Sequence, residues 1–238
     1  MWSRVGTGSA GAGLAALGFA LGGVLIERGA LAPVTSWLAE VGQLTAVGPS
    51  LAALVGLPQP GVALAAAALA GVWLWALSPV TDPSRHWGWP ATGTALGLVG
   101  VLAWVTGALA GWNWGLSITG PSRSLFEAVF LSNPGSLSWG AAMLVGLVLG
   151  SWASARSWGP VVWRAPGPPE LARRFLGGLL MGAGGTLAGG CNIGNALTGL
   201  SILSVHSVIA TAAIVAGGAL AIRLTAGSSG NSRLAPAG

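Results

Sequence analysis

Long apolar segments separated by short polar stretches run through this chain of 238 residues. Several of them approach the roughly 20 residues that an α-helix needs to cross a bilayer. A polar, glycine-containing tail at residues 225–238 ends the chain, and we expect it to be disordered. The pattern predicts six membrane crossings, at residues 9–26, 61–77, 91–110, 137–155, 175–203 and 205–222.

Two further apolar segments contain charged and helix-breaking residues. Residues 30–57 hold Glu40 and two prolines, and residues 112–130 hold Arg123, Glu127 and a proline. Such segments are typical of re-entrant or interfacial helices, which occur at membrane depth only where protein or water covers the backbone. The two glutamates are either proton-coupling groups or, as the plainer interpretation, exposed loop carboxylates. Arg123 either steers anions from outside or orients its loop.

The two halves of the chain resemble each other weakly. Each half places a glycine-containing span before a glycine-bearing break, at residues 18–33 and 177–192, and a short broken helix follows. Discontinuous helices in matching positions of two halves point to a transport site near the middle of the bilayer. We therefore expect one transmembrane domain of residues 1–238, with a first repeat at about 9–130 and a second at about 137–224.

Composition strengthens the prediction of an all-α, polytopic membrane protein. Hydrophobic residues make up 53% of the chain and charged residues 6%, and this charged share is about a quarter of that in soluble domains. The net charge of +5 comes from ten basic residues, all arginine. Sparse arginines at helix ends orient a membrane protein, which explains the basic charge better than nucleic-acid binding does.

The arginines also predict an orientation. If the N-terminus is cytoplasmic, eight arginines fall on the cytoplasmic side and only Arg28 and Arg123 fall outside. We therefore expect a multi-pass protein of the inner (plasma) membrane with both termini in the cytoplasm. Glu27 and Arg28, which end the first span, form either a gate pair or a helix-end charge pair.

The most distinctive segment is residues 177–199, which contain nine glycines and the single cysteine, Cys191. The sequence GGCNIG, residues 189–194, breaks the helix at this cysteine. Small residues recur every four positions and predict a ridge that another helix can approach closely, at Gly178, Gly182, Thr186, Gly190 and Gly194.

The break also supplies hydrogen-bond donors for a small anion. Backbone N–H groups are freed at such a break, and a thiol adds a polarizable sulfur and a weak donor. In the alternative interpretation, Cys191 is a small packed residue of a glycine-rich helix, and Asn192 caps the helix that follows. The candidate substrate-binding residues are Cys191, Gly190, Asn192, Gly194 and Asn195.

Other chemistry finds little support in the sequence. A single cysteine excludes an internal disulfide and a multi-cysteine metal site. No spacing predicts a catalytic set, a phosphate-binding loop or a metal-ligand cluster, so we expect neither an enzyme nor a bound cofactor. His206, at the start of the last span, either lines the transport path or lies at the membrane interface.

Residues 177–200, GGLLMGAGGTLAGGCNIGNALTGL, resemble the glycine–cysteine motif of the YeeE/YedE family of sulfur-transport membrane proteins. The likeness continues through residues 201–224 and is weaker at residues 18–29 and 114–120. Its hallmark GGC-x-x-G turn and the later glycine are here Gly189, Gly190, Cys191, Gly194 and Gly199.

The resemblance implies uptake of thiosulfate or a related small sulfur-containing anion. It also implies two inverted repeats whose broken helices meet at the centre, with cysteine thiols that contact the substrate sulfur. Only Cys191 matches a cysteine position, and Ala32 stands where a first-half thiol is often found. Either one thiol suffices, or a second membrane subunit supplies others.

Two other hypotheses stay open. In the first, the protein is a membrane sulfur-transfer component whose Cys191 accepts a persulfide from a soluble sulfurtransferase. In the second, it is a non-transporting partner subunit of a sulfur-metabolism complex, which would explain the absent first-half thiol.

Overall fold

The structure is a computed structural model that describes residues 1–29, 32–33, 36–37, 50–77 and 88–229. These residues form helices and connecting turns, and the described part of the chain contains no β-strand beyond two isolated bridges. The expected all-α architecture is confirmed. The broken segment predicted at residues 30–57 lies mostly outside the described residues, and so does Glu40.

Helices α2 (Ala10–Glu27) and α9 (Pro168–Leu187) form the centre of the bundle and pack along their length. The side chain of Ser9 accepts a hydrogen bond from the Ala12 N–H and caps α2. Prolines in the first turn begin α9, where their missing N–H groups leave no hydrogen bond unmade.

Glycines let these two helices approach closely. Gly178 and Gly182 of α9 lie directly against the carbonyl groups of Ala15 and Phe19, so that a Cβ at either glycine would overlap an oxygen atom. Gly18 and Gly22 of α2 meet the α9 backbone in the same way, at Phe175 and Leu179. The contact is therefore reciprocal, and it confirms the close packing predicted from the small-residue ridge that includes Gly178 and Gly182.

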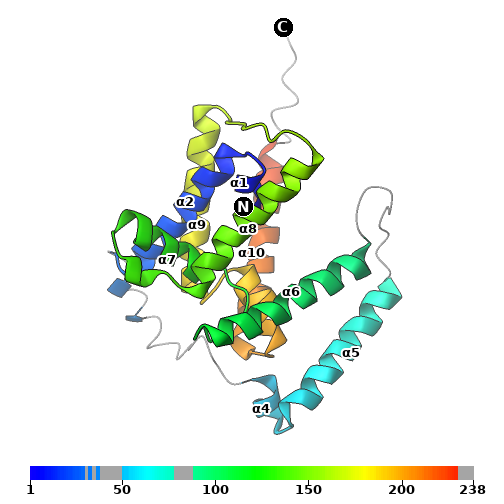
Figure 1. Cartoon of the computed structure of the whole chain (residues 1–238). Coiled ribbons are helices and arrows are strands. Elements are labelled where there is room, and N and C mark those ends of the chain that lie inside the picture. Colours follow the sequence, from blue (N-terminus) through cyan, green and yellow to red (C-terminus); the bar gives the residue numbers. More distant parts are fainter. Residues whose placement is uncertain (30–31, 34–35, 38–49, 78–87, 230–238) are drawn as a thin grey trace.

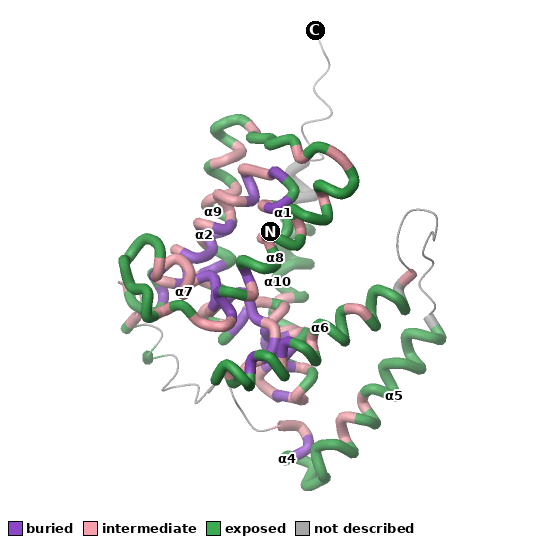
Figure 2. The backbone as a smooth tube through the Cα atoms, viewed as in Figure 1, coloured by how far each residue is buried: buried purple, intermediate pink, exposed green. Residues whose placement is uncertain are grey.

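Three more helices complete the bundle: α1 (Trp2–Gly6), α7 (Thr119–Phe130) and α8 (Trp139–Trp158). Helix α1 packs on α8, and α7 packs on α2. Buried residues concentrate where these helices meet (Figure 2), around the apolar cluster of Phe19, Ile118 and Leu144.

The remaining helices are α4 (Leu51–Val55), α5 (Gln59–Leu77), α6 (Trp89–Leu109) and α10 (Val205–Ser229). Helices α5 and α6 extend away from the bundle (Figure 1), and their large apolar side chains are exposed. Exposed apolar surface of this extent is typical of a site that contacts a membrane or another protein. Four described helices are long and apolar enough to cross a membrane: Ala10–Glu27, Gln59–Ala76, Pro90–Leu109 and Val205–Leu224.

The described part of the chain therefore has fewer clear spans than the six predicted crossings. Helix α8 is as long as a span but is not among the four sufficiently apolar helices. Helix α9 begins at Pro168, seven residues before the crossing expected at residues 175–203, and ends at Leu187. A turn and a short π-helix, η2 (Ile193–Gly199), follow it, which confirms the break predicted at GGCNIG.

A one-turn 3₁₀ helix, η1 (Pro134–Ser136), separates α7 from α8 and lies between the segments predicted at residues 112–130 and 137–155. One further boundary differs from expectation. Helix α10 continues to Ser229, five residues into the expected tail, and residues 230–238 lie outside the described part.

Candidate substrate site

The break after α9 is a tight turn at Gly189 and Gly190. Gly189 has φ +65°, a left-handed conformation that costs glycine little and most other residues more. A Cβ at this position would also lie 2.9 Å from His206 Nε2. The turn therefore requires glycine on two independent grounds.

Asn195 holds this turn together. Its Nδ2 group donates hydrogen bonds to the carbonyl oxygens of Ala188 (3.2 Å) and Gly190 (2.7 Å). Its Oδ1 accepts a hydrogen bond from the Ser207 hydroxyl of α10 at 3.1 Å. With 2% of its surface exposed, Asn195 has its polar atoms occupied by protein groups and braces the turn from within.

His206 approaches the same turn from α10. Its Nε2 atom lies 3.1 Å from the Ala188 carbonyl oxygen, within hydrogen-bond distance. The ring is half-buried and contacts the polar backbone at the end of α9. His206 is therefore part of the scaffold around the break.

The first half of the chain meets the turn at the start of α7. The backbone N–H of Cys191 donates a hydrogen bond of 2.9 Å to the Thr119 hydroxyl. The Thr198 hydroxyl donates one of 2.5 Å to the Leu116 carbonyl oxygen, and a Cβ at Gly194 would lie 3.6 Å from Ser117 Oγ. The broken segments of the two halves thus lie in contact.

The residues predicted to bind substrate lie in two environments. Cys191 is a free thiol that is half-buried and packs against the apolar cluster, whereas Gly190 and Gly194 are buried. Asn192 is exposed, and its side chain makes no capping hydrogen bond to η2. Asn192 thus occupies the N-cap position of η2, as the alternative interpretation expects, but without a side-chain capping bond.

Three residues of this site are not singled out by the sequence pattern: Ser117, Thr119 and Ser207. Ser117 and Thr119 lie in WGLSITG, residues 114–120, a segment whose likeness to the family distinguishes no individual residue. Ser117 and Thr119 are 8% and 7% exposed. A small hydroxyl in an otherwise apolar, broken segment is the feature that points to them.

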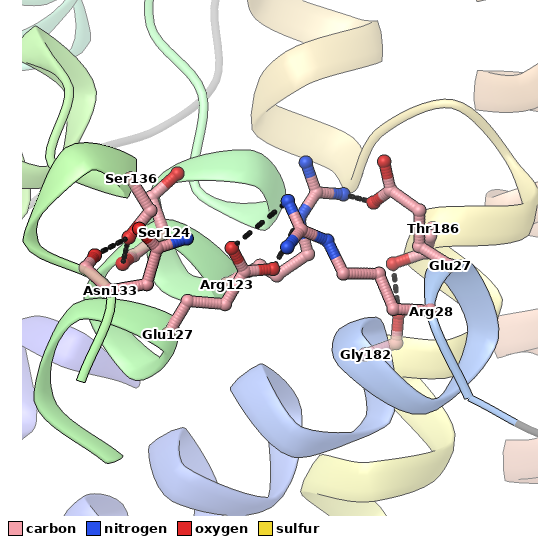
Figure 3. Close-up of polar contacts among 9 residues, drawn as sticks. All are labelled: Glu27, Arg28, Arg123, Ser124, Glu127, Asn133, Ser136, Gly182 and Thr186. Atoms are coloured by element: carbon pink, nitrogen blue, oxygen red, sulfur yellow. Dashed lines mark hydrogen bonds and ion pairs between the residues drawn. The ribbon is translucent and has the colours of Figure 1, made fainter. Parts of the chain in front are cut away.

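Four charged side chains form a second polar group, which we call the charge quartet: Glu27 and Arg28 at the end of α2, and Arg123 and Glu127 on α7 (Figure 3). Arg123 pairs with Glu27, and Arg28 Nη2 lies 3.3 Å from Glu127 Oε2. The ion pairs of Glu27 and Arg28 therefore reach across to α7.

The burial of Glu127 contradicts its plainer interpretation. Only 2% of this residue is exposed, so the prediction of an exposed loop carboxylate is wrong. Glu127 lies where α7 packs on α2, and the two arginines compensate its charge. No cluster of three or more His, Cys, Asp or Glu side chains suited to a metal ion occurs among the described residues.

Long apolar helices, a glycine-rich break and a half-buried thiol at the junction of two broken segments define a polytopic helical membrane protein of the transporter class. A model of the Sulphur transport family matches residues 1–220. The chain belongs to this family, the YeeE/YedE family, whose description and named relatives indicate a transporter and not an enzyme.

Two relatives carry the name "Thiosulfate transporter TsuA". The protein from Spirochaeta thermophila is 33% identical over 228 residues, which are 90% of this chain and 67% of the relative. The protein from Escherichia coli is 33% identical over 113 residues, which are 48% of this chain and 32% of the relative. The chain thus covers about two thirds of the first relative and about one third of the second.

Proposed function

We propose that this protein transports thiosulfate or a related small sulfur-containing anion across the inner (plasma) membrane. The observation that carries the proposal is the position of Cys191 in a chain of the Sulphur transport family. Its backbone is hydrogen-bonded to Thr119 of the other half, so the only thiol lies where the two broken segments meet. Transport sites of repeat-built transporters lie at such junctions.

In this proposal, some residues around the turn contact the substrate and others hold the turn in place. The Cys191 sulfur contacts the substrate sulfur, because a thiol is a soft, polarizable group and a weak hydrogen-bond donor. Gly190 and Gly194 let the substrate approach the backbone closely, and the exposed Asn192 offers amide donors. Asn195 does not contact the substrate, since its own hydrogen bonds are used to hold the turn.

The distribution of arginines supports a cytoplasmic N-terminus. Arg164 pairs with Ser9 in an isolated bridge, and Arg174 packs beside Gly11, so both lie where α2 begins. Arg28 and Arg123 lie at the opposite end of α2, in the charge quartet. We therefore place the beginning of α2 on the cytoplasmic side and the charge quartet on the outside.

Uptake of ³⁵S-labelled thiosulfate into proteoliposomes that contain only this protein is the direct test. Wild type is expected to accumulate label. Cys191→Ala is expected to lose about tenfold in kcat/KM, which corresponds to one lost contact of about 1.4 kcal/mol. Equal uptake by wild type and Cys191→Ala, at equal protein content, would remove the thiol from the mechanism.

Thiol labelling provides a second readout, because Cys191 is the only cysteine and any label reports on it alone. Bound thiosulfate is expected to slow alkylation of Cys191 by a maleimide, whereas chloride at equal ionic strength is not. Persulfide transfer onto Cys191 from a soluble sulfurtransferase, without uptake, would favour the sulfur-transfer component. Uptake only after addition of a second membrane protein would favour the partner subunit.

A further inference from the structure

We propose that Arg123 is an anion-binding residue on the path to Cys191, and that Glu27 occupies its guanidinium until a substrate anion displaces it. The inference rests on the proposed transport of a small sulfur-containing anion. The charge quartet then has a binding role. The exposed Glu27 carboxylate is exchanged for the substrate anion, and the buried Glu127 carboxylate stays beside Arg123.

Arg123 lies on the same face of α7 as the residue that binds the Cys191 turn. Thr119, Arg123 and Glu127 follow one another at intervals of four residues on α7, and therefore lie on one face of that helix. Thr119 accepts the hydrogen bond from the Cys191 backbone. Arg123 is thus four residues, about 6 Å along the helix axis, from the residue that binds the Cys191 turn.

Helix α9 lines the same route from the other side. A Cβ at Gly185 would lie 3.4 Å from Thr119 Oγ1 and 3.8 Å from Cys191 Cβ. Gly23 of α2 faces Thr186, the next residue of α9, and Arg123. Thr186 appears beside the quartet in Figure 3. The small or hydroxyl-bearing residues Thr119, Gly185 and Thr186 therefore lie between the quartet and the thiol.

The two carboxylates beside Arg123 differ in exposure. The Glu127 side chain is 2% exposed, and the Glu27 side chain is 43% exposed. Glu127 Oε1 lies 3.7 Å from Arg123 Nε, beyond hydrogen-bond distance, and has no hydrogen-bond partner. Glu127 therefore acts on Arg123 as a fixed charge, whereas Glu27 makes the direct ion pair from a solvent-accessible position.

The guanidinium of Arg123 is chemically suited to bind an oxyanion. A guanidinium binds oxyanions with a planar fork of N–H donors, and it remains protonated when partly buried. Arg123 is 24% exposed, so a small anion can reach it from the side of Glu27. A divalent anion such as thiosulfate carries more charge than the carboxylate it replaces. During the exchange the buried Glu127 stays beside Arg123, and the displaced Glu27 is exposed. No buried charge is therefore left without a partner.

If the substrate displaces Glu27, removal of the Glu27 charge lowers the KM for thiosulfate. Loss of a purely structural ion pair would not lower it. If Glu27 competes with the substrate, Glu27→Gln removes the competitor and lowers the KM for thiosulfate about threefold to tenfold. If the quartet only fastens α2 to α7, the same change leaves KM unaltered or raises it. Arg123→Gln is expected to raise KM about tenfold or more, because it removes a charged hydrogen bond.

The experiment measures KM for thiosulfate uptake in proteoliposomes for wild type, Glu27→Gln, Arg123→Gln and Arg123→Lys. Glu170→Gln is the matched control, since Glu170 pairs with Arg174 at 2.9 Å on α9 and is exposed to a similar extent, 44%. It is expected to keep the wild-type KM. Arg123→Lys is expected to lie between wild type and Arg123→Gln, because lysine keeps the charge without the fork.

The inference is overturned if Glu27→Gln raises KM or leaves it unchanged. If Arg123→Gln fails to fold, the KM of Glu27→Gln alone still decides whether Glu27 competes with the substrate. A second measurement tests anion binding separately from transport. It is the rise in melting temperature of the purified protein when thiosulfate or sulfate is added. Without any uptake by wild type, a larger stabilisation of Glu27→Gln than of wild type supports the anion site, and an equal or smaller one refutes it.

Discussion

Replacing Gly182 by alanine tests whether direct backbone contact between α2 and α9 holds the bundle together. The new Cβ would overlap the carbonyl oxygen of Phe19. That oxygen belongs to the α2 backbone, so no side-chain rotation can relieve the overlap. The two helices would have to separate by on the order of 1 Å, and a gap of this size forfeits a quarter to a half of each dispersion contact that it opens.

The loss of stability caused by Gly182→Ala can be estimated from this overlap. Overpacking of a well-packed interface costs about 1 to 3 kcal/mol. Because Gly18, Gly22 and Gly178 lie in the same interface, separation at one point weakens the contact at all of them. At about 2 to 4 °C per kcal/mol for a chain of this size, Gly182→Ala should lower the melting temperature by about 2 to 12 °C.

Gly184→Ala is the matched control on the same helix. A Cβ at Gly184 has nothing within 4 Å, so alanine should stabilise α9 by up to about 1 kcal/mol through its higher helix propensity. The assay is thermal unfolding of both purified variants in one detergent. The reasoning is refuted if Gly182→Ala melts at the same temperature as Gly184→Ala, or above it.

Two further predictions concern the Cys191 turn. Thr119→Val keeps the shape of the side chain but leaves the Cys191 N–H without its acceptor, at a cost of about 1 to 3 kcal/mol. It should lower the melting temperature and the uptake rate, whereas Thr119→Ser should retain both, and wild-type behaviour of Thr119→Val would contradict the bridging role. Asn195→Ala removes the donors to the Ala188 and Gly190 carbonyl oxygens and should loosen the turn, so Cys191 should react with a maleimide several times faster. An unchanged labelling rate would show that other contacts hold the turn.

Hydropathy predicted most of the helices, because a bilayer imposes a length and a composition on every segment that crosses it. The segment expected at residues 9–26 is α2 (Ala10–Glu27), and the one expected at residues 91–110 is α6 (Trp89–Leu109). The beginning of α9 was missed for the same reason. Its first turn, with Pro168 and Glu170, is polar, and a hydropathy pattern locates apolar segments, not helices that extend beyond them.

The charge quartet was inaccessible to sequence reasoning on physical grounds. Glu27 and Arg123 are separated by 96 positions in the sequence, and nothing local distinguishes a carboxylate that will be buried from one that will be exposed. Glu127 lies on a short amphipathic helix that reads equally well as a surface segment. Its burial follows from the packing of α7 on α2, which places two arginines beside it and makes an otherwise costly charge tolerable.

The glycine ridge shows how far a periodic pattern extends before it fails. Its repeat of four residues correctly places Gly178 and Gly182 against α2. The repeat then continues in the sequence to Gly190 and Gly194, but α9 ends at Leu187 and the chain turns at the left-handed Gly189. A helical period carries no information across such a turn, because the following helix has a new axis. Gly190 consequently lies against Asn195, and Gly194 faces Ser117. The same spacing thus serves helix packing before the break and, at Gly194, contact with the first half of the chain after it.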